Sequence, residues 1–61
     1  MNESVNFYDI LEVSEAASPE VIRAAYQSLA KRWHPDKNLN DQETAKLKMQ
    51  AINGAYAVLS D

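Results

Sequence analysis

Helix-breaking residues are scarce in this chain, and that scarcity constrains its fold more than any other feature. The 61 residues include one glycine, Gly54, and two prolines, Pro19 and Pro35. No β-branched run alternates with polar residues in the way that a half-buried strand requires. The sequence therefore predicts an all-α fold of one domain, with interruptions near the two prolines.

A first long helix is predicted from Ser18 to about Trp33. Ser18 is a good N-cap, and Pro19 stands at the first helical position, where its missing N–H costs nothing. The helix should stop near Trp33 because Pro35 disfavours helical geometry at His34. The apolar stripe of this helix consists of Ile22, Ala25, Tyr26, Leu29 and Trp33.

A second long helix is predicted from Asp41 to Leu59. It opens at Asn40 or Asp41, and Glu43 lies three residues after Asn40, as in a capping box. Gly54 either permits close packing here or is tolerated at a cost of about 1 kcal/mol relative to alanine. The apolar stripe consists of Ala45, Met49, Ile52, Ala55, Tyr56 and Leu59.

A short helix is predicted from Phe7 to about Leu11, with Asn6 as its N-cap. Tyr8 and Leu11 should face inward together, whereas Phe7 is expected to be partly exposed. The two long helices should form an antiparallel hairpin, joined by a loop of about seven residues, with the short helix covering one open side.

Composition excludes several classes of protein. Without cysteine, disulfides and thiolate metal sites are excluded, and with a single histidine neither a structural zinc site nor a cofactor is expected. The net charge of −3 argues against nucleic acid as the main partner. No apolar run approaches the roughly 20 residues that span a bilayer, and residues 1–5 lack the features of a secretory signal. A cytoplasmic location is the default expectation.

The tripeptide His34-Pro35-Asp36 interrupts the two long helices at the tip of the hairpin. One interpretation is a rigid loop whose groups meet a partner. The other is a simple helix stop, in which Asp36 caps a turn and His34 covers the core. The spacing of the residues leaves both interpretations open.

Four separated segments carry a resemblance to the J-domain of DnaJ-type co-chaperones. They are Phe7-Tyr8-Asp9-Ile10-Leu11, Ile22-Arg23-Ala24-Ala25-Tyr26, the run from Leu29 through His34-Pro35-Asp36 to Asn38, and Ala55-Tyr56-Ala57-Val58-Leu59-Ser60-Asp61. The matching pattern extends over residues 7–61. The resemblance implies a non-enzymatic module that docks on a DnaK-type heat-shock chaperone and stimulates its ATP hydrolysis.

The same resemblance implies roles for individual residues. Asp36 would offer its carboxylate to an arginine of the chaperone, Pro35 would fix the loop, and His34 would hold Asp36 in place. A basic helix face with the adjoining loop would meet an acidic patch on the chaperone; the alternative is a merely solvated face. The residues of this face and loop are Arg23, Tyr26, Lys31, Arg32, Lys37 and Asn38, with Gln27 and Lys48 as further candidates.

The sequence departs from the family pattern at a few positions. Gln27 and Ser28 stand where a Lys/Arg pair is usual, which thins the basic face. Glu12 occupies a position often held by glycine, and Met49 replaces a common phenylalanine. The family's fourth helix would begin at about Asp61, so a truncated or minimal form of the domain is expected.

Two other kinds of function remain as alternatives. A J-like scaffold would bind the chaperone without stimulating it, and the thin face at Gln27 and Ser28 supports this reading. A DNA-binding helical module is disfavoured by the net charge. An independent enzyme is the weakest candidate, because no nucleophile–base set is visible. Client proteins are expected to bind regions outside this chain.

Overall fold

The computed structural model describes residues 6–60, which form an all-α fold without strands. Its helices are α1 (Phe7–Ile10), α2 (Pro19–Arg32) and α3 (Gln42–Leu59), with the short 3-10 turns η1 (Pro35–Lys37) and η2 (Leu39–Asp41) between α2 and α3. The predicted helical fold class is confirmed. The N-terminal residues 1–5 and Asp61, where a fourth helix was expected to begin, lie outside the described residues.

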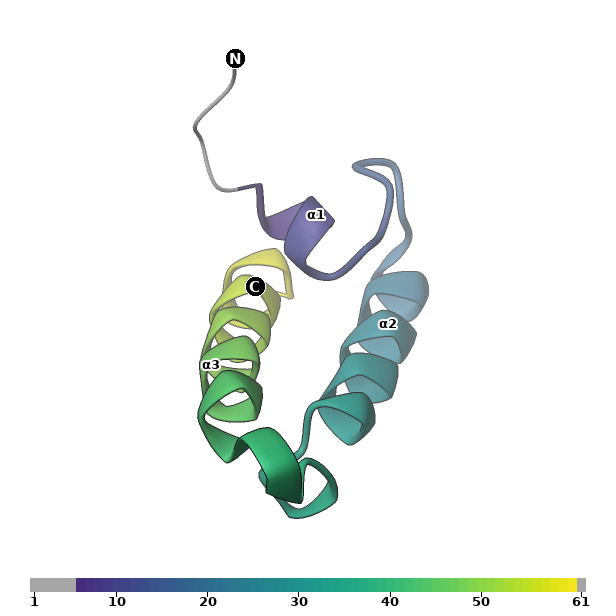
Figure 1. Ribbon diagram of the computed structural model, residues 1–61. Helices are drawn as coiled ribbons and strands as arrows, with labels where there is room; N and C mark the ends of the chain where they lie inside the picture. The colour runs from purple at the N-terminus through teal and green to yellow at the C-terminus, as the bar shows by residue number, and fades with distance from the viewer. Residues whose placement is uncertain (1–5, 61) are drawn as a thin grey trace.

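The helices α2 and α3 run antiparallel as a hairpin, and α1 lies across the end where α2 begins and α3 finishes (Figure 1). Helix α1 packs mainly on α3. The two 3-10 turns occupy the opposite end of the hairpin (Figure 1). The predicted hairpin, its short covering helix and the position of the loop at one tip are therefore confirmed.

A small core lies between the three helices. Leu11 is completely buried, and it packs with residues from both long helices. The buried residues of this cluster are Leu11, Ile22, Leu29, Ile52 and Ala55. Those of α2 and α3 come from the predicted stripes, and Phe7 is 37% exposed, as expected. The inward orientation of Leu11 follows from its place at the end of α1.

An aromatic contact joins α2 to α3 at the side of this core. The rings of Tyr26 and Tyr56 stack with their centroids 4.3 Å apart. The Tyr26 hydroxyl also donates a hydrogen bond of 2.8 Å to Oδ1 of Asn53. Stacking and hydrogen bonding together fix Tyr26 against α3, which sets the rotation of α2 about its own axis.

The N-caps of all three helices lie at positions that the sequence predicted, since Asp41 was one of the two residues expected to open α3. The side chains of Asn6 and Ser18 accept hydrogen bonds from Tyr8 and Val21, as their N-cap roles require. At α3 the predicted capping box of Asn40 and Glu43 is wrong. The cap is Asp41, whose Oδ1 accepts the N–H of Thr44 at 3.1 Å. Asn40 lies inside the turn η2 (Leu39–Asp41), so α3 begins only after Asp41.

The chain leaves α1 through a left-handed residue. Glu12, which stands at a position often held by glycine in the family, has a φ of 59°. Its N–H donates to the carbonyl of Asp9 and the N–H of Val13 donates to that of Tyr8, which is the Schellman arrangement. Gly54, by contrast, faces open space, so it is tolerated in α3 and does not permit a close contact.

Candidate functional site

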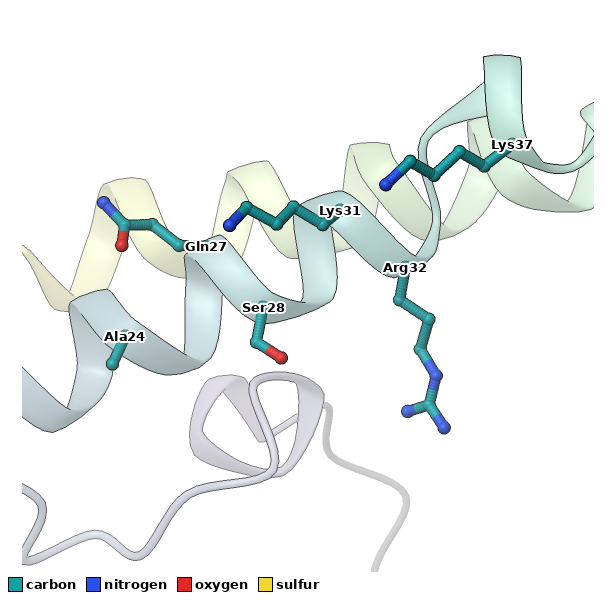
Figure 2. A pocket seen from close by; sticks show the side chains of 6 residues that line it. All are labelled: Ala24, Gln27, Ser28, Lys31, Arg32 and Lys37. Carbon is teal, nitrogen blue, oxygen red and sulfur yellow. The ribbon is translucent and has the colours of Figure 1, made fainter.

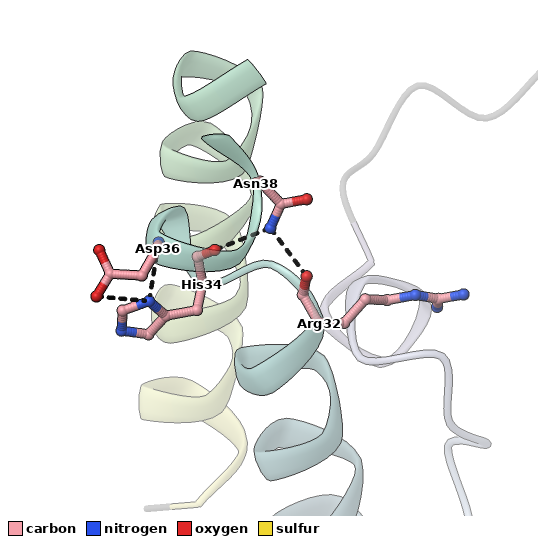
Figure 3. Close-up of polar contacts among 4 residues, drawn as sticks. All are labelled: Arg32, His34, Asp36 and Asn38. Atoms are coloured by element: carbon pink, nitrogen blue, oxygen red, sulfur yellow. Dashed lines mark hydrogen bonds and ion pairs between the residues drawn. The ribbon is translucent and has the colours of Figure 1, made fainter. Parts of the chain in front are cut away.

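The loop at the hairpin tip is built around His34, the N-cap of η1 (Figure 3). The Nδ1 atom of His34 accepts the backbone N–H of Asp36 at 3.1 Å. Pro35 occupies the first position of η1, where its lack of an N–H leaves no donor unsatisfied. The three residues therefore form one capped turn, in which the imidazole is used to fix the backbone of Asp36.

The carboxylate of Asp36 is left free by this turn. Its side chain is 88% exposed, and its Oδ2 atom lies 3.8 Å from Nδ1 of His34. No hydrogen bond to the carboxylate is formed within the described residues 6–60. The His34 side chain is itself 54% exposed. Helix α2 does end before this loop, but the helix-stop interpretation is wrong about the two side chains: within residues 6–60 Asp36 caps no turn, and His34 is exposed and does not cover the core.

Asn38 connects this loop to the end of α2. Its side-chain Nδ2 donates to the carbonyl of Arg32 at 3.0 Å and to that of His34 at 2.8 Å (Figure 3). Its backbone N–H donates to the carbonyl of Pro35 at 3.1 Å. The sequence placed Asn38 among the partner contacts, and the structure directs its amide toward the protein's own backbone.

Beside the loop, the outer face of α2 carries a shallow basic recess of about 500 Å³. It is lined by Ala24, Gln27, Ser28, Lys31, Arg32 and Lys37. Lys31 and Lys37 extend in the same direction from neighbouring elements, and Arg32 points away from them (Figure 2). None of these three cations forms an ion pair within the part of the chain that the structure describes. We call this surface the basic recess.

The other predicted contact residues lie apart from the basic recess. Arg23 lines a separate cavity of about 220 Å³ between the start of α2 and the end of α3. Tyr26 is half-buried against Tyr56, as described above. On α3, Nζ of Lys48 lies 5.4 Å from the centroid of the Trp33 ring, a cation–π distance. Of the residues predicted for the helix face and loop, four line the recess (Gln27, Lys31, Arg32 and Lys37) and four lie elsewhere (Arg23, Tyr26, Asn38 and Lys48).

Ala24 and Ser28 are the recess residues that were not named as contacts from the sequence. They lie four residues apart and therefore share one face of α2. Their small side chains line the recess together with the longer side chains of Gln27, Lys31, Arg32 and Lys37. Two small residues spaced four apart, next to the basic residues Lys31 and Arg32, are the sequence signal that would have identified Ala24 and Ser28 as part of this surface.

The described residues contain few features of other kinds of site. No group of three or more His, Cys, Asp or Glu within residues 6–60 could hold a metal ion. None of the helices in that range has the length and apolar character needed to cross a membrane. Hydrogen bonds from the side chain and backbone of Thr44 hold the pKa of the Asp41 carboxyl below its ordinary value of 3.8.

Comparison with known proteins identifies the family. The model of the DnaJ domain matches residues 6–61, which is nearly the whole chain. The chain belongs to the DnaJ domain family. This J-domain is 52% identical over 56 residues to DnaJ homolog subfamily B member 8 of Mus musculus and of Homo sapiens. It is 49% identical over 57 residues to DnaJ homolog subfamily B member 6 of Homo sapiens.

The matches cover almost all of this chain and a small part of each relative. The alignments with member 8 cover 92% of this J-domain and about a quarter of the length of each relative. The alignment with human member 6 covers 93% of this J-domain and 18% of the length of that relative. The family therefore establishes a J-domain of the co-chaperone type. The partner and the mode of action of this chain belong to the proposal below.

Proposed function

We propose that this J-domain docks on a DnaK-type heat-shock chaperone and stimulates its ATP hydrolysis through His34-Pro35-Asp36. Membership of the DnaJ domain family supports a chaperone ATPase as the partner. The observation that carries the proposal is the exposed carboxylate of Asp36, on a turn whose own hydrogen bonds are complete without it. A charged group held in this way costs little to order on binding.

In this proposal, each residue of the triplet has a separate task. The carboxylate of Asp36 accepts charge-assisted hydrogen bonds from an arginine of the chaperone, with room for a bidentate pair. Pro35 fixes φ within the turn, and the imidazole of His34 holds the N–H of Asp36. None of these groups takes part in bond breaking. They bind one conformation of the chaperone better than another, which shifts its equilibrium toward the hydrolytic state.

The basic recess supplies the attraction that brings the two proteins together. Lys31, Arg32 and Lys37 offer unpaired positive charge beside the loop, which suits an acidic chaperone surface. Because these charges are exposed, the affinity should fall as the salt concentration rises. Gln27 and Ser28 line the recess without adding charge, so we expect the salt dependence to be modest.

The test is the single-turnover ATPase rate of a DnaK-type chaperone with the wild-type J-domain and with Asp36→Asn. We expect the variant to abolish stimulation, because the neutral amide cannot form the charge-assisted pair. Its stability should stay within about 0.5 kcal/mol of the wild type, since Asp36 makes no buried contact.

The matched control is Glu43→Gln, which removes one negative charge from an exposed side chain in the first turn of α3. It should stimulate as the wild type does. Undiminished stimulation by a folded Asp36→Asn variant would sink the proposal. A wild-type domain that binds the chaperone without accelerating its ATP hydrolysis would instead favour the scaffold, which the uncharged lining residues Gln27 and Ser28 support.

A further inference from the structure

Asn38 forms more hydrogen bonds within the tip than any other residue there. Its side-chain amide reaches the carbonyls of Arg32 and His34 at 3.0 and 2.8 Å. Its backbone N–H reaches the carbonyl of Pro35, and its own carbonyl accepts the N–H of Asp41 at 3.0 Å. One residue therefore ties together the end of α2, the turn η1 and the turn η2.

The two carbonyls that the amide joins belong to different parts of the site. Arg32 ends α2, so its carbonyl is among the last four that have no partner within the helix. His34 begins the loop, and its carbonyl also accepts the N–H of Lys37 at 2.9 Å. The Asn38 amide donates a hydrogen bond to the free carbonyl at the end of α2 and another to the carbonyl of His34, so it holds the loop to the helix end.

The Asn38 amide carries two N–H donors on one nitrogen, so it can give one donor to each carbonyl. Both donors of the Asn38 amide are used internally, so they are not available to a partner. An aspartate of the same shape would place oxygen against oxygen at both contacts. The chemistry therefore requires the amide, and it directs that amide inward.

We propose that Asn38 is a positioning residue, which clamps the His34-Pro35-Asp36 loop to the end of α2 and acts on the partner only through that loop. This inference rests on the function proposed above. The clamp fixes the Asp36 carboxylate relative to the basic recess, because the recess lies on α2 and Lys37. Both surfaces can then meet one rigid chaperone face at the same time.

The test compares Asn38→Asp with Asn40→Asp. The two variants add the same charge to neighbouring positions of the tip, but Asn40 is exposed and its side chain forms no hydrogen bond within residues 6–60. Affinity for a DnaK-type chaperone and the maximal ATPase rate at saturating J-domain are measured separately. Asn38→Ser, which retains a single donor, serves as a second variant.

We expect the maximal stimulation to fall about ten-fold in Asn38→Asp, since two hydrogen bonds at the loop are lost. The dissociation constant should change less than about two-fold, because the side chains of the recess are untouched. Asn38→Ser should lie between the wild type and Asn38→Asp, and Asn40→Asp should match the wild type. A loss of affinity equal to the loss of stimulation in Asn38→Asp would overturn the inference. Equal losses of stimulation in Asn38→Asp and Asn40→Asp would also overturn it.

The amide NMR signals of the isolated domain test the clamp without any partner. In Asn38→Asp, the signals of Asp36 and Lys37 should shift and exchange faster with solvent, while those of the core residues Leu29 and Ile52 stay in place. Unchanged loop signals would overturn the clamp. If the wild type stimulates no DnaK-type ATPase, the proposed function fails, and the NMR comparison still decides the clamp.

Discussion

The turn that ends α1 and the turn that ends α2 differ in what they do with their side chains. After α1, Leu11 enters the core completely, and Glu12 adopts a left-handed conformation so that the chain can reverse. After α2, no residue of η1 or η2 is buried, and polar side chains complete the backbone hydrogen bonds. The first turn stabilises the fold, and the second presents groups to solvent.

This difference shows at which positions the amino-acid sequence of the domain can change without loss of stability. The α1 turn accepts a strained residue because the burial of Leu11 offsets the strain. The tip has almost no apolar contact to lose, so its sequence is free to serve recognition. Variants at matched positions in the two turns test this contrast.

The largest expected difference in the free energy of unfolding is between alanine substitutions of two leucines, one in each turn. Leu11→Ala should lower the free energy of unfolding by about 2–5 kcal/mol, because it leaves a cavity at the most buried site. For a domain of this size, such a loss should leave a large unfolded fraction. Leu39→Ala is the matched control at the tip, where the leucine is 72% exposed, and it should cost less than about 0.5 kcal/mol. Urea unfolding followed by circular dichroism measures both, and equal losses would contradict the contrast.

Glu12→Gly is expected to stabilise the domain by about 1 kcal/mol. Glycine adopts a φ of 59° without strain, and that gain exceeds the added flexibility of the unfolded chain. Gly54→Ala is the reverse exchange inside α3, and it should also stabilise by about 1 kcal/mol, because the new methyl group meets no neighbour. Thermal unfolding checks both variants. A destabilised Glu12→Gly would show that the Glu12 side chain makes a contribution larger than the strain.

The smallest effect on stability is expected from Asp41, the N-cap of α3, at acidic pH. The pKa of Asp41 is lowered because Thr44 hydrogen-bonds the ionised carboxylate. A lowered folded pKa contributes stability above the unfolded value of about 3.8 and loses it as the pH falls through the folded value. Asp41→Asn should therefore flatten the acid side of the stability profile slightly, since the group is fully exposed. Urea unfolding between about pH 5 and pH 2 measures this slope. An unchanged slope in Asp41→Asn would contradict the assignment.

Much of the fold could be predicted because the signals for helices are local. Ser18 and Pro19 define the start of α2, and the stripes of α2 and α3 repeat at helical spacing. The sequence left the cap of α3 open between Asn40 and Asp41, because the turn η2 competes with the helix for the same segment. Such a competition depends on how the tip packs against α3, and the sequence alone does not show it.

The sequence by itself determined the helical class, the two core stripes, the placement of His34-Pro35-Asp36 at a tip and the resemblance that names the family. These follow from patterns within a few turns of one chain segment. Tertiary structure decided which residues share the basic recess, that Arg23 lies outside it, and that the Asn38 amide turns inward. Those facts depend on hydrogen bonds and surfaces formed between separate elements. Only the folded backbone brings these groups into contact.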